Sequence, residues 1–175
     1  QLTAELLVLF AYMHQARVPV PRDLLISYCG VRDVQWDDVQ FYLDTIGKLV
    51  REYEGLYADH TQDCFASRSA IFAEKSLMKA PSKVVKRVLE IVHKEISILK
   101  IPRYDVFQRH AFDNEIFARA FPNWEEGYGL YTYVYERDVD GERSPYIMQQ
   151  CALYASRKHQ HKEAFKAIDE ALRRS

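Results

Sequence analysis

Apolar residues recur at three- and four-residue steps near the start of the chain, and this spacing predicts helices. The first helix runs from Leu2 to about Ala16 and ends at Val18-Pro19-Val20-Pro21, because each proline disfavours helical geometry in the residue before it. A short second helix is predicted over Asp23 to Cys29, where Gly30 suits the C-terminal cap. The chain therefore opens on two compact helices.

A third helix and a β-hairpin are predicted next. Asp33 or Asp37 caps the helix, and its apolar stripe continues until Gly55 ends it. Two short apolar runs between Leu56 and Ala66 flank a polar segment, which is the pattern of a small hairpin. A further helix is expected over residues 70–78. Three helices, a hairpin and another helix form the element order of a winged-helix domain.

The middle of the chain predicts further helical packing. A long amphipathic helix is expected from Ser82 to Leu99, followed by a segment from Phe107 to Phe121 that is too apolar for a solvated face. The segment from Leu130 to Glu136 is rich in aromatic and β-branched residues, and its pattern is compatible with either a helix or a strand. We expect a helix there, because an isolated strand would leave its backbone groups without partners, and we expect a loop over residues 138–142.

The last segment predicts a helical hairpin, with one helix from Pro145 to about Ser156 and another from His161 to Arg174. In the second helix a small, a large and a small side chain share one face: Ala164, Ile168 and Ala171. This arrangement resembles a tetratricopeptide repeat, although Met148 stands where such repeats carry tryptophan. Any antiparallel helical pair is the alternative. The resemblance implies that neighbouring helices stack on the hairpin.

These patterns predict a mostly α fold in two parts, a winged-helix domain at residues 1–78 and a tetratricopeptide-like segment at residues 79–175. Hydrophobic residues make up 48% of the chain and charged residues 28%, which excludes a wholly disordered or membrane-spanning protein. The formal net charge of -1 provides no global basic field to attract nucleic acid or anionic lipid. Any charged partner would have to bind locally.

Three widely spaced cysteines, Cys29, Cys64 and Cys151, form no CxxC pair and indicate reduced thiols in a cytoplasmic protein. The chain begins at Gln1 inside an apolar helical pattern and without the features of a signal peptide. We therefore expect it to be a fragment of a longer protein.

The segment Phe65-Ala66-Ser67-Arg68-Ser69, followed by a helix with the pair Ala73-Glu74, resembles the winged helix of STAND-type signalling NTPases. Ser69 stands where histidine is commonest in that family. The resemblance implies that Arg68 and Ser69 lie near a nucleotide held by an upstream domain, and that downstream repeats sense a protein ligand. ATP or ADP and homo-oligomerisation would then belong to the parent NTPase, and this segment needs no cofactor of its own. The alternative for Arg68 is a solvated surface arginine.

The predicted third helix opens on acidic residues, which bears on its partner. Asp37 and Asp38 would face DNA phosphates in a winged-helix DNA binder and would repel them. We therefore interpret the domain as a protein-packing module in which these two residues are candidate interaction sites. The alternative is a nucleic-acid-binding regulator with a helical oligomerisation tail, whose groove would use Arg17, Arg22, Arg32, Lys48 and Arg51.

Catalytic chemistry finds little support in the sequence. The chain has no GxxxxGK[ST], GxGxxG or GxSxG motif, so it lacks a phosphate-binding loop and a nucleophile elbow. An enzyme centred on Arg109, His110 and Asp113 is a third hypothesis, but a structural hydrogen-bonded cluster explains these residues better because no nucleophile or oxyanion donor is near them in sequence. We assign no catalytic residue.

A metal site is likewise not assigned. His159, His161 and Glu163 could offer a metal two histidines and a carboxylate, but they straddle the turn between the two terminal helices, where polar residues are expected anyway. Four residues are the candidate interaction sites of the second half: Arg109, His110, Met148 and Tyr154.

The leading hypothesis is a regulatory and interaction fragment of a STAND-type NTPase. It would relay the nucleotide state of an upstream domain to a repeat-based sensor that binds a protein ligand. Prokaryotic defence is the context that this architecture suggests by analogy. Nucleic acid and membranes are disfavoured as partners.

Overall fold

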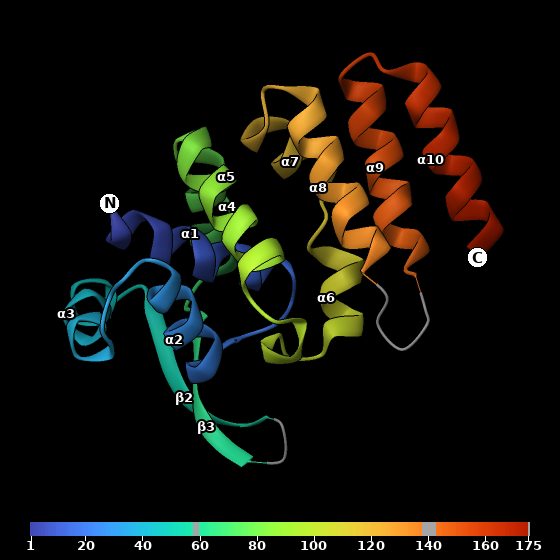
Figure 1. Cartoon of the computed structure of the whole chain (residues 1–175). Coiled ribbons are helices and arrows are strands. Elements are labelled where there is room, and N and C mark those ends of the chain that lie inside the picture. The colour runs from blue at the N-terminus through green and yellow to red at the C-terminus, as the bar shows by residue number, and fades with distance from the viewer. Residues whose placement is uncertain (58–59, 138–142, 175) are drawn as a thin grey trace. The chain divides into compact units, whose positions relative to one another are not determined.

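A computed structural model of the chain describes residues 1–57, 60–137 and 143–174 (Figure 1). The fold is mostly helical, as predicted, with one small sheet. It divides into two compact units, unit 1 at Gln1–Phe107 and unit 2 at Gln108–Ser175. The predicted domain boundary after residue 78 therefore lies inside unit 1, because α5 (Ser82–Glu90) packs on α1 (Leu2–Gln15).

Helix α1 is the centre of unit 1. Its side chains are buried on almost every side, among them Leu6, Phe10 and Tyr12, as expected of a helix that is apolar all round. Three further helices belong to the same unit: α2 (Arg22–Val31), α3 (Trp36–Ile46) and α4 (Ala70–Lys79). The predicted cap Gly30 lies inside α2 instead, since the helix continues to Val31.

A three-stranded antiparallel sheet completes the first part of unit 1. Its strands β1 (Val20–Pro21), β2 (Val50–Tyr57) and β3 (His60–Ser67) are ordered β1-β3-β2, and Figure 1 shows β2 and β3 side by side. The hairpin was predicted, but the prediction that Gly55 ends the third helix was wrong. Gly55 lies within β2 opposite Gln62, and glycine allows a close approach there because an added Cβ would lie 2.8 Å from Sγ of Cys64.

The helix predicted to reach Leu99 is shorter and irregular. Helix α5 passes into a π-helical turn at Ile91–Glu95, and a short 3₁₀ turn follows at Ile98–Lys100. The π-helical turn places the buried His93 ring within unit 1, with its Nε2 2.8 Å from the Tyr12 hydroxyl oxygen. A polar pair is therefore satisfied inside the apolar core.

Helix α6 (Tyr104–His110) spans the boundary between the units, and unit 2 contains α7 (Asn114–Ala120), α8 (Trp124–Glu136), α9 (Pro145–Arg157) and α10 (His161–Arg174). The helix expected over 130–136 is confirmed as part of α8, and the terminal hairpin is confirmed as α9 and α10. Figure 1 shows α8, α9 and α10 side by side in that order. The loop predicted over 138–142 lies outside the described residues.

The Phe107–Phe121 segment consists of two helices, because Asp113 starts a new one. Its Oδ1 accepts hydrogen bonds from the backbone N–H groups of Glu115 and Ile116, at 2.9 and 3.1 Å. Aromatic rings from α7, α8 and α9 pack in the core of unit 2, with Phe117 stacked on Tyr131 at a centroid distance of 4.2 Å. Most apolar residues of the segment are buried, as its composition predicted.

The contact between α9 and α10 differs from the predicted repeat pattern. Ala167 and Ala171 are the buried residues of α10, each 2% exposed, whereas the expected bulky residue Ile168 is 37% exposed. Phe165 and Leu172 are also exposed on this helix. The helices therefore approach through small side chains, and a large part of the apolar surface of α10 is left uncovered within unit 2.

Candidate interaction surface

The outward side of α3 forms an acidic face, which we define by its exposed residues Asp37, Asp38, Gln40, Phe41 and Asp44. Phe41 is 71% exposed and is held at the edge of the Tyr42 ring, with the two centroids 5.7 Å apart. Aromatic side chains are enriched in the buried centres of protein–protein interfaces. The acidic face is therefore a candidate surface for a protein.

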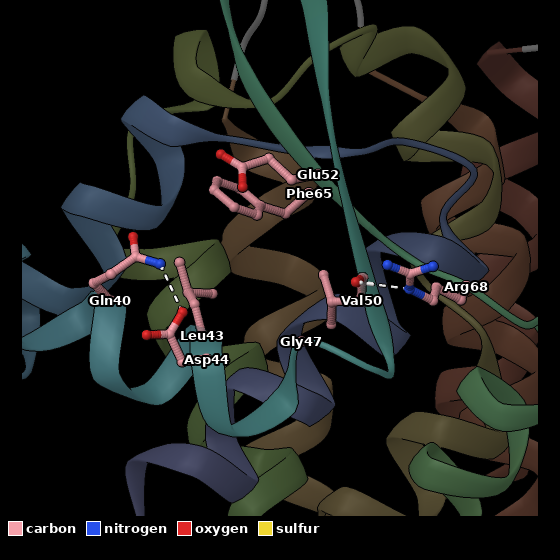
Figure 2. A pocket seen from close by; sticks show the side chains of 8 residues that line it. All are labelled: Gln40, Leu43, Asp44, Gly47, Val50, Glu52, Phe65 and Arg68. Carbon is pink, nitrogen blue, oxygen red and sulfur yellow. Dashed lines mark hydrogen bonds between the residues drawn. The ribbon is translucent and has the colours of Figure 1, made fainter.

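A shallow pocket of about 170 Å³ adjoins the acidic face (Figure 2). We call it the α3–hairpin pocket, because its lining comes from the end of α3, the following turn and both hairpin strands. The lining residues are Gln40, Leu43, Asp44, Gly47, Val50, Glu52, Phe65 and Arg68. The apolar members are buried and the polar members are exposed, so the pocket has an apolar floor and a polar rim.

Two carboxylates and one guanidinium stand on this rim. Asp44 accepts a hydrogen bond from Gln40 Nε2 at 3.0 Å, and Arg68 Nε donates to the Val50 carbonyl at 3.1 Å. Among the residues that the structure describes, neither Asp44 nor Glu52 forms an ion pair. With Arg68 counted, the rim carries a net negative charge, which disfavours a phosphate group there.

The two candidate nucleotide-proximal residues lie at the start of α4 and differ in role. Ser69 is the N-cap of α4, and its hydroxyl accepts a hydrogen bond from the Phe72 N–H at 3.2 Å. Arg68 is exposed and lines the α3–hairpin pocket. A helix cap explains Ser69 without a ligand, and the nucleotide proximity of both residues stays a prediction.

Three of the five basic residues required by the nucleic-acid alternative have partners in unit 1. Arg22 lies 3.8 Å from Asp63 and over the Trp36 ring, and Arg51 lies over the Tyr53 ring. Arg32 forms a two-point ion pair with the buried Glu5, which accepts from Nε at 2.9 Å and from Nη2 at 3.2 Å. The two remaining cations, Arg17 and Lys48, are exposed.

The polar cluster at the start of unit 2 has a structural explanation. Asp113 caps α7, and Arg109 is exposed with its guanidinium 5.6 Å from the centroid of the Tyr146 ring. His110 is half-buried. Arg157 Nε donates a hydrogen bond to Asn114 Oδ1, and Arg157 Nη2 forms an ion pair with Glu115 Oε1 at 2.7 Å. The cluster joins the beginning of α7 to α9.

Met148 and Tyr154, the remaining candidate interaction residues, are buried in unit 2. The Tyr154 hydroxyl donates to the Trp124 carbonyl at 3.1 Å, and burial raises the pKa of the Tyr154 phenol above its ordinary value. A partner would reach these side chains only if the helices separated.

The cysteines have the environment of packing residues. All three thiols are free and buried, and burial raises the pKa of Cys29 to about 11 and that of Cys151 to about 12. Such thiols are neutral near pH 7 and are weak nucleophiles. Within the described ranges, no group of His, Cys, Asp or Glu has the arrangement of a metal site, and no helix has the length and apolarity to cross a membrane.

Comparison of the chain with family models, with curated proteins and with solved structures found no match. The candidate surface therefore depends on geometry alone. Sequence reasoning identified Asp37, Asp38 and Arg68 but missed the contribution of Glu52 and Phe65. Glu52 lies in the first part of β2, which had been predicted as helix, and Phe65 had been considered only as part of the hairpin and the NTPase-like motif.

Proposed function

We propose that the chain is a regulatory and interaction segment that binds a protein through the acidic face of α3, in a signalling NTPase of the STAND type. The observation that carries the proposal is Phe41, which is 71% exposed on a helix face with three carboxylates. Exposed aromatic side chains are favoured anchors of protein interfaces. The winged-helix part of the proposal is supported by the element order of unit 1 and by the strand order β1-β3-β2.

The same face argues against the nucleic-acid alternative. In a winged-helix DNA binder the third helix enters the major groove, where basic and amide side chains contact bases and phosphates. Here that helix presents Asp37, Asp38 and Asp44. Each carboxylate would lie in the strongly negative field of the DNA backbone.

Unit 2 supports the repeat part of the proposal through the uncovered surface of α10. Phe165 is 71% exposed and Leu172 is 69% exposed, although Ala167 and Ala171 of the same helix are packed. Repeat units bury such surfaces against neighbouring units. The relay hypothesis places the ligand sensor in this part of the protein.

A site-specific photo-crosslinker at position 41 in living cells tests the proposal. Met78 on α4 is the matched control position, because its side chain is 69% exposed, close to the value for Phe41. We expect position 41, and not position 78, to capture one discrete protein. Replacing Phe41 with alanine should weaken binding of the purified captured protein about tenfold or more.

Two outcomes would contradict the proposal. Cross-linking of position 41 to nucleic acid would favour the alternative. Equal capture at positions 41 and 78 would show that the acidic face has no specific partner.

A further inference from the structure

We propose that the α3–hairpin pocket receives the side chain of an arginine or lysine from the protein partner. This inference rests on the proposed interaction function and names the chemistry that the partner contributes at the centre of the surface. It is carried by the size of the pocket, its apolar floor and the unpaired carboxylates on its rim.

The pocket has the size and floor that suit one long side chain. Its volume of about 170 Å³ is well below the roughly 300–1,000 Å³ of sites that enclose a small-molecule ligand. Leu43, Val50 and Phe65 form the floor and are 8%, 7% and 4% exposed. Arginine and lysine pack their methylene stems on such apolar surface while the charged group stays near water.

The charges of the rim favour a cation. Asp44 and Glu52 contribute two negative charges against the single positive charge of Arg68, and neither carboxylate has an ion-pair partner among the described residues. Figure 2 shows Asp44 and Arg68 on opposite sides of Val50, with the Arg68 Nε occupied by the Val50 carbonyl. A guanidinium or ammonium group could therefore approach the carboxylates without meeting Arg68 directly.

The position of Asp44 in its helix is an independent indication that the pocket binds a cation. Asp44 lies in the last turn of α3, where the partial negative charge of the helix C-terminus disfavours a carboxylate. No basic residue occupies that turn to compensate. A cation in the pocket would supply the missing positive charge, so the pocket gives Asp44 a role that helix stability does not.

Amide NMR of the ¹⁵N-labelled chain with three pentapeptides tests the inference. The peptides are capped alanine sequences with a central arginine, a central citrulline, which is the neutral isostere of arginine, or a central glutamate. We expect the arginine peptide to give saturable shifts at Leu43, Gly47 and Val50. The citrulline peptide should bind about tenfold more weakly or not at all, because it lacks the charge-assisted hydrogen bonds.

Matched variants assign the binding to the rim. The combined change Asp44→Asn and Glu52→Gln should weaken the arginine peptide about tenfold. Glu54→Gln removes an exposed carboxylate that does not line the pocket, and it should change the affinity by less than about twofold. The single change Glu52→Gln, on an exposed strand position, keeps the test valid if the double variant unfolds.

Equal binding of the arginine and citrulline peptides, or no shift with arginine, would overturn the inference. Shifts at the pocket with the glutamate peptide alone would show that Arg68 makes it an anion site instead. None of these results decides the cross-link at position 41, so failure of the pocket proposal is distinguishable from failure of the proposed function.

Discussion

Gly127 is the position where unit 2 should be most sensitive to a single methyl group. It lies in α8, and a Cβ at this residue would be 2.6 Å from Cζ of Tyr154, closer still to its hydroxyl oxygen, and 3.1 Å from Cβ of Phe121. Tyr154 has no free space to move into, because it is fully buried and its hydroxyl donates to the Trp124 carbonyl. We therefore predict that Gly127→Ala destabilises unit 2.

The size of this loss in unfolding free energy is the sum of one stabilising and two destabilising contributions. Alanine is favoured over glycine in a helix by about 1 kcal/mol. Overpacking a buried site costs about 1–3 kcal/mol, and displacing Tyr154 loses a hydrogen bond with a net value of about 1 kcal/mol. The sum predicts that the free energy of unfolding falls by about 1–3 kcal/mol.

Urea unfolding followed by tryptophan fluorescence measures this effect on unit 2 alone. The chain has two tryptophans, Trp36 in unit 1 and Trp124 in unit 2, so a Trp36→Phe background reports only unit 2. Gly129→Ala is the matched control in the same helix, since nothing lies within 4 Å of its added Cβ. That variant should be neutral or stabilising by up to about 1 kcal/mol.

A double-mutant cycle with Tyr154→Phe tests the cause. Removing the hydroxyl relieves the shortest of the three contacts, and the hydrogen bond to the Trp124 carbonyl can be lost only once. The double variant should therefore be more stable than the sum of the single effects by about 1 kcal/mol. Additive effects, or a Gly127→Ala variant as stable as Gly129→Ala, would refute the reasoning.

Three further predictions concern unit 1. Glu5→Ala should lower the free energy of unfolding in urea by about 2–4 kcal/mol, because it leaves the Arg32 guanidinium, which is 28% exposed, without its carboxylate. A Glu5→Leu/Arg32→Met double variant should lose less of this free energy, because neither charge remains. The pKa of Cys29 is raised from 9.0 to about 11, so the neutral thiol stabilises the fold below pH 9. This contribution is lost as the pH rises from 9 to 11. Cys29→Ala should therefore flatten that part of the plot of unfolding free energy against pH. Gly55→Ala should lower the thermal midpoint of unit 1 through contact with the Cys64 sulfur, and adding Cys64→Ala should restore part of it.

The helices of unit 2 were predictable because local signals define them. Pro145 occupies the first turn of α9, as the sequence indicated, and α10 follows the predicted bounds from His161 to Arg174. The face that α10 buries was less predictable. Either Ile168 or Ala167 could continue a three- and four-residue pattern, and only the close approach to α9 selects the smaller side chain.

The end of α3 shows where periodicity fails. Val50 lies four residues after Ile46, so it continues the apolar stripe of the helix, yet it begins β2 and pairs with Ser67. That pairing joins residues far apart in sequence, and a local window cannot detect it. The pocket was hidden for the same reason, because its rim combines Asp44 of α3 with Glu52 of β2 and Arg68 beyond β3.

The acidic residues of α3 lie at opposite ends of the helix dipole, and this difference decides which of them indicate a binding partner. Asp37 and Asp38 lie in the first turn, where backbone N–H groups favour carboxylates by about 0.3–1 kcal/mol each. Helix stability alone accounts for them. Asp44 lies at the opposite end, where the same field is unfavourable and the hydrogen bond from Gln40 offsets only about 0.2–0.5 kcal/mol. Because Asp44 lines the pocket and the first two residues do not, the carboxylate that weakens the helix is the one best placed to bind a cation.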